Sequence, residues 1–435
     1  MRRIVLVLLA FGGLFVAISC RELASQEQKI EPRQRENAVA MLSSVHGALK
    51  KNYYDPTFHG IDVDARYKAY QERINKSETL GDAFRTVAAY LSGLNDSHTF
   101  FIPPRRSYSA DYGYRMQIIG EGCYITEVRP GSDAAERLHR GDQVVSLNGY
   151  SVGRKDIWQL EYYLRHIAPK PATEFTLRAP SGEVRKVQVE TKFQQGKHLK
   201  DANDWDLTVE FEKEEHLLRE RYIEQGDVMF WKMPAFEVDE NAIDQMIGRA
   251  RKHKKLILDL RGNPGGYVTA LMRMLGSFFS YDVTIDTQVM RKEQKPQVAK
   301  SRGKNIFTGD LIVLIDSNSA SAAELFARVI QLEHRGTVVG DRSSGSVMEA
   351  RMYPFHEGWD VIVVYGASIT MADLIMRDGK SLENVGVTPD VIVMPSAAEL
   401  AEGQDPALAQ AARLAGIELD PAVAGSFFPF EWAEM

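Results

Sequence analysis

Long apolar segments are missing from this sequence beyond its first 18 residues, so nothing further along the chain is expected to cross a bilayer. Positive charge is not in excess either: the formal net charge is −6, whereas a nucleic-acid surface needs a concentrated basic face. The sequence has no His-Glu-x-x-His pattern, no cysteine pair, no spaced carboxylate loop and no phosphate loop. Neither a metal nor a cofactor is therefore expected. What remains is an ordinary globular composition, with 44% hydrophobic residues, in a chain of 435 residues that can form two or three domains.

Cysteine is scarce, and the two that occur, Cys20 and Cys123, have different predicted roles. Arg2 and Arg3 precede an apolar stretch over residues 4–18, and small residues lead into Cys20, which is typical of an export signal resembling a bacterial lipobox. Cleavage there would leave Cys20 diacylated and anchored to a membrane, which predicts a periplasmic or cell-envelope location. The alternative is a plain signal peptide in which Cys20 is incidental. Cys123 then has no disulfide partner, and its apolar surroundings predict a small buried residue.

Hydrophobic periodicity divides the rest of the chain into three folded units. Apolar residues recur three and four positions apart up to residue 94, which predicts a helical domain. Short β-rich runs separated by turns such as Asn148-Gly149 predict a second unit. The third alternates strands and helices, which is typical of an α/β layer with largely parallel strands. The predicted divisions are a signal peptide (1–19), a tether (20–33), the helical domain (34–108), the β-rich domain (109–195), the α/β core (196–395), and a C-terminal helix and tail (396–435).

Within the α/β core, apolar runs and turn residues predict individual elements. Strands are expected at 255–259, 311–315 and 337–340, and helices at 267–278 and 321–331. A charged stretch over residues 197–221 is expected to link the core to the β-rich domain. Beyond the core, one helix is expected at 407–414, followed by an aromatic-rich end to which the sequence assigns no role.

Ser321 lies where a buried strand turns into a helix, a position that exposes a hydroxyl at the edge of a sheet. The helix N-terminus beside it favours developing negative charge, as nucleophilic catalysis requires. The simpler alternative is a capping box, because Ser321 and Glu324 have the spacing with which many helices satisfy their first N–H groups. The local pattern alone favours the cap.

Residues 122–149 resemble the PDZ family in three places: Pro130-Gly131-Ser132-x-Ala134, Arg140-Gly141-Asp142 and Leu147-Asn148-Gly149. A PDZ domain adds a peptide strand to a sheet edge and holds its C-terminal carboxylate with backbone N–H groups. The resemblance implies a peptide-binding loop at Gly113, Tyr114, Arg115 and Met116, although the usual Gly-Leu-Gly-Phe-like loop is not spelled out there. The alternative is a packing domain without a ligand.

Two distant motifs accompany the Ser321 turn. One is Leu258-Asp259-Leu260-Arg261-Gly262-Asn263-Pro264-Gly265-Gly266, and the other is Leu382-Glu383-Asn384-Val385-Gly386-Val387-Thr388-Pro389-Asp390. Together with Ser319-Ala320-Ser321-Ala322-x-Glu324 they resemble, in order, the core of the tail-specific, or C-terminal-processing, serine proteases. The resemblance implies a crotonase/ClpP-like α/β core with Ser321 as nucleophile. It also implies an oxyanion hole formed by the amides of Ala322 and of either Gly265 or Gly266.

The residue at the position of the general base differs from that in the lysine-using branch of the family. Where that branch has its lysine, this sequence has Ser346, and a serine hydroxyl cannot accept a proton near neutral pH. The element Asp96-Ser97-His98-Thr99 resembles instead the tricorn-like branch, in which histidine is the base. The resemblance implies that Glu383 orients His98 and that Ser97 is an auxiliary serine, although a hydroxyl there could equally cap the turn.

These features predict a serine endopeptidase that forms an acyl-enzyme, with polypeptides that have apolar C-terminal tails as partners. A rival interpretation is an inactive, lipid-anchored binding protein that keeps the fold and has lost the lysine. His98 and Glu383 occurring together favour the enzyme. A third, weaker interpretation is a peptidase that trims short peptides, with the PDZ-like unit acting as a gate. The sequence carries no signal for an oligomeric state.

Overall fold

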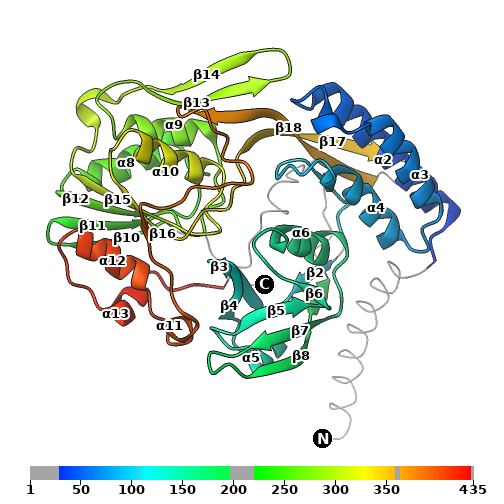
Figure 1. Ribbon diagram of the computed structural model, residues 1–435, viewed down its shortest axis with the longest axis horizontal. Helices are drawn as coiled ribbons and strands as arrows, with labels where there is room; N and C mark the ends of the chain where they lie inside the picture. Colours follow the sequence, from blue (N-terminus) through cyan, green and yellow to red (C-terminus); the bar gives the residue numbers. More distant parts are fainter. Residues whose placement is uncertain (1–28, 107, 196–219, 358–362, 433–435) are drawn as a thin grey trace, which may run out of the picture.

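The structure is a computed structural model that describes residues 29–106, 108–195, 220–357 and 363–432. The predicted signal peptide, Cys20 and most of the charged stretch over residues 197–221 therefore lie outside the described residues. Figure 1 shows three units: a helical unit in blue, a β-rich unit in cyan and green, and a larger α/β unit in green to red. No helix in the described ranges is both long enough and apolar enough to span a membrane.

The predicted helical domain consists mainly of the helices α2 (Pro32–Asn52), α3 (Val63–Asn75) and α4 (Leu80–Ser92). Two start at side-chain caps: Asp62 accepts N–H groups at the start of α3, and Thr79 does so at the start of α4. The chain then forms the short strand β1 (Phe100–Ile102), which pairs antiparallel with β18 (Val363–Met376) of the α/β unit. The helical unit and the C-terminal part of the core are therefore joined through one sheet.

That sheet also contains β13 (Val283–Met290), β14 (Gln294–Ala299) and β17 (Met348–Glu357), with β13 and β17 both paired with β18. It shares apolar side chains with the helical unit, since Tyr365, Ala367 and Ile369 of β18 belong to the same buried cluster as the helices. β18 is the longest strand of the sheet and ends six residues before Leu382. Its position brings the segment that contains Glu383 close to the end of the helical unit.

The β-rich unit is built on a sheet with the strand order β3-β4-β5-β7-β8, in which β3 (Tyr114–Ile119) is an edge strand. The other elements are β2 (Tyr108–Asp111), β4 (Gly122–Val128), α5 (Asp133–Arg137), β5 (Gln143–Leu147), β6 (Tyr150–Ser151), α6 (Ile157–Glu161), η2 (Tyr162–Ile167), β7 (Ala172–Arg178), β8 (Val184–Glu190) and β9 (Lys192–Gln195). The predicted Asn148-Gly149 turn joins β5 to β6, and both of its residues have positive φ. Cys123 is a buried free thiol, as predicted, and burial raises its pKa.

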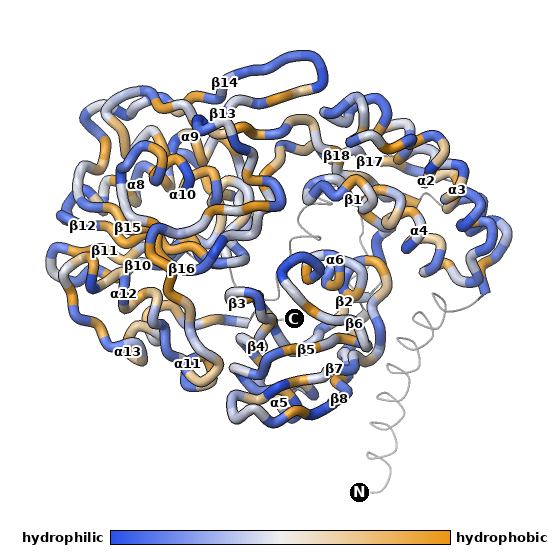
Figure 2. The backbone as a smooth tube through the Cα atoms, viewed as in Figure 1, coloured by the Kyte–Doolittle hydropathy of each residue, from blue (hydrophilic) through white to orange (hydrophobic). Residues whose placement is uncertain are grey.

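The α/β unit has a second sheet with the order β10-β11-β12-β15-β16-β19, parallel except for the β10–β11 pair. Its strands are β10 (Arg221–Gln225), β11 (Val228–Lys232), β12 (Lys255–Asp259), β15 (Asp310–Ile315), β16 (Thr337–Gly340) and β19 (Val391–Ile392). β12 and β16 begin and end where the sequence predicts, and β15 begins one residue earlier. Figure 2 shows apolar residues concentrated in the central strands β11, β12 and β15.

Helices cover both faces of this sheet. On one face α8 (Glu240–Ala250), α9 (Val268–Gly276) and α10 (Ala322–Leu332) share a buried apolar cluster with alternate strand residues. On the other face lie α12 (Pro406–Leu414) and α13 (Pro421–Gly425). The expectation of a single helix after residue 395 was incomplete. The structure adds α11 (Ala397–Ala401) and α13, which are too short to show a helical period in the sequence.

Candidate active site

Ser321 lies in the turn between β15 and α10, immediately before the helix. Its backbone has φ 52° and ψ −116°, whereas two other serine caps, Ser132 and Ser396, have φ of −87° and −72°. A non-glycine residue in this region costs about 1–3 kcal/mol and persists only where the surrounding structure imposes it. The capping box with Glu324 is also present, with Glu324 Oε2 3.0 Å from the Ser321 nitrogen. Capping needs no such strain, so the backbone of Ser321 favours a further role for its hydroxyl.

The glycine-rich turn after β12 lies directly against Ser321. Gly265 and Gly266 have φ of 104° and 135°. A Cβ at position 265 would lie 2.7 Å from Ser321 Cβ, and one at position 266 would lie 2.5 Å from the backbone carbon of Phe236. Only glycine fits at either position, and its lack of a side chain lets backbone amides approach the serine.

The amides at this turn differ in whether they already have acceptors. The Gly265 N–H donates to Asn263 Oδ1 at 2.9 Å. The N–H of Gly266 has no hydrogen-bond acceptor within the described part of the chain. Ala322 is the first residue of α10, where an N–H has no acceptor inside the helix. Gly266 and Ala322 are therefore the two amides at this turn that remain available to a ligand.

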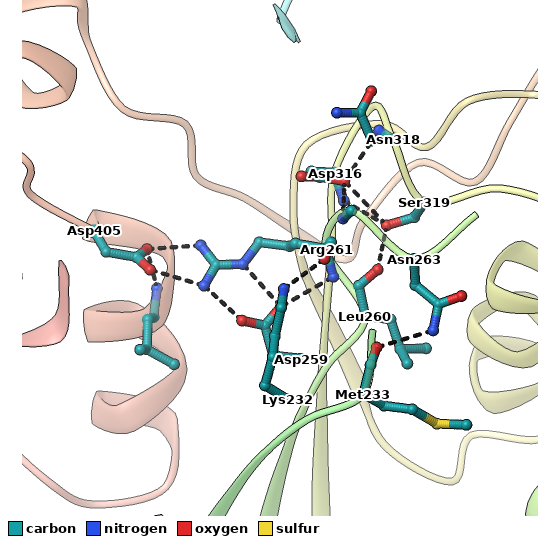
Figure 3. Close-up of polar contacts among 12 residues, drawn as sticks. Lys232, Met233, Asp259, Leu260, Arg261, Asn263, Asp316, Asn318, Ser319 and Asp405 are labelled. Carbon is teal, nitrogen blue, oxygen red and sulfur yellow. Dashed lines mark hydrogen bonds and ion pairs between the residues drawn. The ribbon is translucent and has the colours of Figure 1, made fainter. Parts of the chain in front are cut away.

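A network of charges holds the glycine-rich turn (Figure 3). Asp259, which is 1% exposed, accepts a hydrogen bond from Arg261 Nη2 at 2.8 Å and one from Lys232 Nζ at 3.2 Å. Arg261 also reaches both carboxylate oxygens of Asp405, the cap of α12, at 2.8 Å each. Burial alone would raise the pKa of Asp259, but the two neighbouring cations hold it well below its usual value. Asn263 completes the support, with Nδ2 2.9 Å from the carbonyl oxygen of Met233.

Ser97, His98 and Glu383 form a continuous hydrogen-bonded chain. Ser97 Oγ lies 2.8 Å from His98 Nδ1 and 2.8 Å from Glu383 Oε2. The Ser97 backbone N–H donates to Glu383 Oε1 at 2.8 Å. In the structure Ser97 lies between Glu383 and His98, so Glu383 can orient the imidazole, as the resemblance implies, only through the Ser97 hydroxyl. The Ser97 hydroxyl therefore bridges the two side chains.

A buried carboxylate anchors the histidine. Asp96 accepts the His98 backbone N–H at 2.9 Å and the Thr370 hydroxyl at 2.8 Å. Thr99 Oγ1 in turn accepts the Thr370 N–H at 3.0 Å. These contacts follow from the β1–β18 pairing, which sets the His98 turn beside β18. Asp96 and Thr370 were not among the predicted site residues; the only sequence signal was the place of Asp96 two residues before His98.

The loop from Ser343 to Val347 links the two halves of the site. Its Ser346, at the position of the missing lysine, accepts the Ser321 N–H through its carbonyl oxygen at 2.9 Å. The next residue, Val347, donates its N–H to Glu383 Oε2 at 2.9 Å. Consecutive Cα atoms are about 3.8 Å apart, so the Ser321 turn and Glu383 contact adjacent residues of one loop. Within the described residues no hydrogen bond joins His98 to Ser321 directly.

Glu324 organises this loop and was predicted only as a helix cap. Its buried carboxylate accepts hydrogen bonds from the Ser343 hydroxyl at 2.5 Å and from the Gly345 and Ser346 N–H groups at 2.8 and 3.0 Å. Burial raises its pKa to about 7, although these donors oppose the shift. The carboxylate therefore ties the loop to the helix that begins at the serine.

The pKa values of His98 and Glu383, the two titratable groups joined through Ser97, are both shifted from their usual values. Burial lowers the pKa of His98, while the nearby charge of Asp96 acts in the opposite direction. Burial raises the pKa of Glu383 to about 7, and the charge of Asp96 adds to this, although the hydrogen bonds from Ser97 and Val347 oppose it. The imidazole is thus neutral at neutral pH, which is the form able to accept a proton. In the described ranges no three or more His, Cys, Asp or Glu side chains are arranged to hold a metal ion.

The four residues predicted to bind peptide lie at the start of β3. Gly113 has φ 69°, and a Cβ there would lie 2.6 Å from Ser132. The side chains of Tyr114 and Met116 are buried in the core of the β-rich unit. Arg115 faces the other side of the sheet, with its guanidinium 5.2 Å from the ring centroid of Phe430. Only Arg115 among the four therefore has a side chain on the side away from that core.

Residues 227–393 match the model of peptidase family S41. Among curated proteins, the chain is 23% identical over 380 residues to carboxyl-terminal-processing peptidase 3, chloroplastic, of Arabidopsis thaliana, covering 82% of this chain and 70% of that protein. It is 24% identical over 315 residues to the tail-specific protease of Haemophilus influenzae, covering 68% of this chain. The chain spans only 43% of the length of that second relative.

Solved structures resemble the fold over most of the chain. The crystal structure of mature CPAF aligns with a TM-score of 0.63 at 15% identity, covering 85% of this chain and 94% of that one. The photosystem II D1 C-terminal processing protease aligns with a TM-score of 0.51 at 18% identity, covering 89% and 99%. At such low identity the likeness concerns the fold alone.

Proposed function

We propose that the chain is a serine endopeptidase of peptidase family S41, in which Ser321 is the nucleophile and His98 the general base. The observation that carries this proposal is the Glu383–Ser97–His98 hydrogen-bonded chain, which lies beside a serine with strained backbone. A protein that had lost its base along with the lysine would have no reason to keep this arrangement. The proposal therefore takes precedence over the inactive binding protein.

The hydrogen-bonded chain fixes the tautomer of His98. An ionised Glu383 can only accept hydrogen bonds, so the single hydroxyl proton of Ser97 points to Glu383. Ser97 Oγ must then accept from His98 Nδ1, which carries the ring proton and leaves Nε2 with a free lone pair. That lone pair can take the proton from Ser321 Oγ as the oxygen attacks the scissile carbonyl. Glu383 stabilises the imidazolium that results, acting through Ser97.

Backbone amides would stabilise the oxyanion of the tetrahedral intermediate. The carbonyl π electrons move to oxygen as the Ser321 Oγ–carbon bond forms, and the amides of Ala322 and Gly266 are available to receive that charge. The amide of Gly265 is already bound to Asn263, so we assign the second donor to Gly266. Collapse of the intermediate releases the amine, which takes the proton from His98. Water then hydrolyses the acyl-enzyme by the same steps in reverse.

We propose that the β-rich unit is a PDZ domain that presents polypeptide substrates with apolar tails. Its sheet ends at β3, an edge strand to which an extended peptide can add by backbone hydrogen bonds. The same strand touches the catalytic unit, because Gln117 Nε2 lies 2.7 Å from Asp316 Oδ2 and the Ile118 carbonyl accepts the Ser317 hydroxyl at 2.5 Å. A peptide bound there would lie near the Ser321 turn. The lipobox-like segment before Cys20 supports export and lipid anchoring in the cell envelope.

The test uses purified protein that starts at Cys20, with Ser321→Ala and His98→Ala variants beside it. Each is treated with a fluorescent fluorophosphonate, which labels activated serines, and is then offered unfolded casein. We expect the unchanged protein to be labelled and to cleave casein, and both variants to fail in both assays. An unchanged protein that is neither labelled nor active, with or without added tail peptides, would contradict the proposal and favour the binding-protein interpretation.

Activity should rise with pH through the pKa of Glu383, at about pH 7. Below that value Glu383 carries a proton and donates it to Ser97, whose hydroxyl then donates to His98 Nδ1. The ring proton moves to Nε2, and the base is lost. Because the pKa of His98 itself is lowered, the titration of His98 does not cause the rise in activity near pH 7. Casein hydrolysis measured from pH 5.5 to 8.5 checks this, and a rate that is flat between pH 6 and 8 would contradict the assignment.

A further inference from the structure

The last described residues cross from the α/β unit to the β-rich unit. Phe427 packs edge-on against Phe230 of β11, with ring centroids 5.2 Å apart. Arg221 donates to the carbonyl oxygen of Pro429 at 2.7 Å and lies 3.6 Å from the carboxylate of Glu431. The segment is thus fixed to the edge of the catalytic sheet before it reaches the β-rich unit.

Two aromatic residues then contact two arginines of the β-rich unit. The Arg115 guanidinium lies 5.2 Å from the ring centroid of Phe430, and that of Arg129 lies 4.5 Å from the ring centroid of Trp432. Both distances are within the range of cation–π attraction. Phe430 and Trp432 also contact each other, with centroids 4.9 Å apart. Both aromatic side chains are partly buried, and Arg129 also pairs with the buried carboxylate of Asp111, its Nε lying 3.4 Å from Oδ1.

The two arginines lie on one face of the sheet. The Arg129 N–H donates to the Gly113 carbonyl at 2.8 Å, so these two residues lie opposite each other just beyond the paired ends of β3 and β4. Arg115 of β3 is paired with Glu127 of β4, and Arg129 follows Glu127 by two positions, so both arginines point to the same side of the sheet. An extended peptide has the same period, which allows Phe430 and Trp432 to face both arginines at once. Trp432 itself lies in a β-bridge, as expected for an extended segment.

We propose that the segment Phe430-Glu431-Trp432 is an internal ligand of the β-rich unit and competes with substrate for it. The recognised chemistry is an extended segment with two aromatic residues separated by one acidic residue. Arg115 and Arg129 of the β-rich unit contact the aromatic rings, and Arg221 of β10 pairs with the acidic residue from the α/β unit. Arg115 is one of the residues that the sequence predicted to bind peptide. The effect on catalysis rests on the proposed peptidase function, whereas the binding itself does not.

The competition is strong because the ligand is tethered. Only Phe428 and Pro429 separate the anchored Phe427 from Phe430, so the segment is presented at an effective concentration of about millimolar or more. A free peptide that binds the same surface with a micromolar dissociation constant must displace it. Releasing the tail should therefore raise the apparent affinity for such a peptide by at least about tenfold.

The experiment measures binding of a fluorescein-labelled peptide of residues 426–432 by fluorescence anisotropy. The proteins are the chain starting at Cys20, its Phe430→Ala/Trp432→Ala variant, and that variant with Arg129→Ala added. We expect the double variant to bind the peptide at least about tenfold more tightly than the unchanged chain, and the added Arg129→Ala to abolish the gain. Val423→Ala, at an exposed position of α13, is the matched control and should leave the affinity unchanged.

Casein hydrolysis and fluorophosphonate labelling separate this inference from the proposed function. We expect hydrolysis by the double variant to rise, with labelling of Ser321 unchanged. Equal peptide affinity of the double variant and the unchanged chain, or a gain that does not depend on Arg129, would overturn the internal ligand while labelling leaves the peptidase intact. Tighter peptide binding without any labelling would support the internal ligand and count against the peptidase. Thermal unfolding of each variant shows that the comparison is between folded proteins.

Discussion

Replacing Ser97 with alanine is expected to lower kcat by about 10²- to 10⁴-fold and to leave KM nearly unchanged. The substitution removes one oxygen, and with it both hydrogen bonds that join His98 Nδ1 to Glu383 Oε2. The imidazole then has no partner that selects the tautomer with a free Nε2. The nucleophile, the oxyanion amides and the β3 edge are untouched, so substrate binding persists. The measurement is steady-state hydrolysis of a fluorogenic peptide by proteins that begin at Cys20.

Ser97→Thr and Ser43→Ala are the matched variants. Threonine retains the hydroxyl and should recover most of the activity, whereas a merely structural role for the small side chain would make threonine as harmful as alanine. Ser43 is exposed on α2, in the same helical unit, and its replacement should change nothing. Ser97→Ala should also lose the rise in activity near pH 7, because Glu383 no longer controls the imidazole. A Ser97→Ala enzyme with unchanged kcat would show that His98 is oriented by something else.

Much of the α/β unit could be predicted because its signals are local. A continuous apolar run followed by glycines defines β12, and its bounds follow directly from the sequence. The turn at Ser321 is similarly local, since a strand, a short polar stretch and a helix occur in succession. The strained φ of that serine could not be predicted, because it depends on the loop around Ser346 and Val347, which arrives from another part of the chain.

The hydrogen-bonded arrangement of Glu383, Ser97 and His98 could be predicted only in part from local sequence. The sequence motif around His98 indicated a base, but its meeting with Glu383 depends on β1 pairing with β18, a long-range contact without a periodic signature. The bridging place of Ser97 depends on side-chain geometry. The choice between Gly265 and Gly266 likewise required the Asn263 side chain, which occupies one of the two amides. An aromatic tail without periodicity gave no sign of its contact with Arg115 and Arg129.

Removing the carboxylate of Asp259 is expected to cost about 3–5 kcal/mol of unfolding free energy, the usual result of breaking a buried ion pair from one side. Asp259→Ala leaves Lys232 without its carboxylate, and Arg261 keeps only Asp405. The pKa of Asp259 is held below its usual 3.8, so its stabilisation is complete above that pH and is lost as the pH falls further. The difference between the variant and the unchanged protein should therefore persist at pH 5 in urea unfolding.

The same substitution should affect catalysis, because Asp259 and Arg261 hold the turn that presents Gly266. We expect the folded fraction of Asp259→Ala to label more slowly with fluorophosphonate, since the oxyanion amide is no longer fixed. Asp64→Ala is the control: Asp64 pairs with Lys50 on the surface of the helical unit, and its loss should leave both the urea midpoint and the labelling unchanged. An Asp259→Ala protein as stable as the control would mean that Asp405 alone neutralises Arg261. In that case the position of the glycine turn would depend on the hydrogen bonds of Asn263 rather than on buried charge.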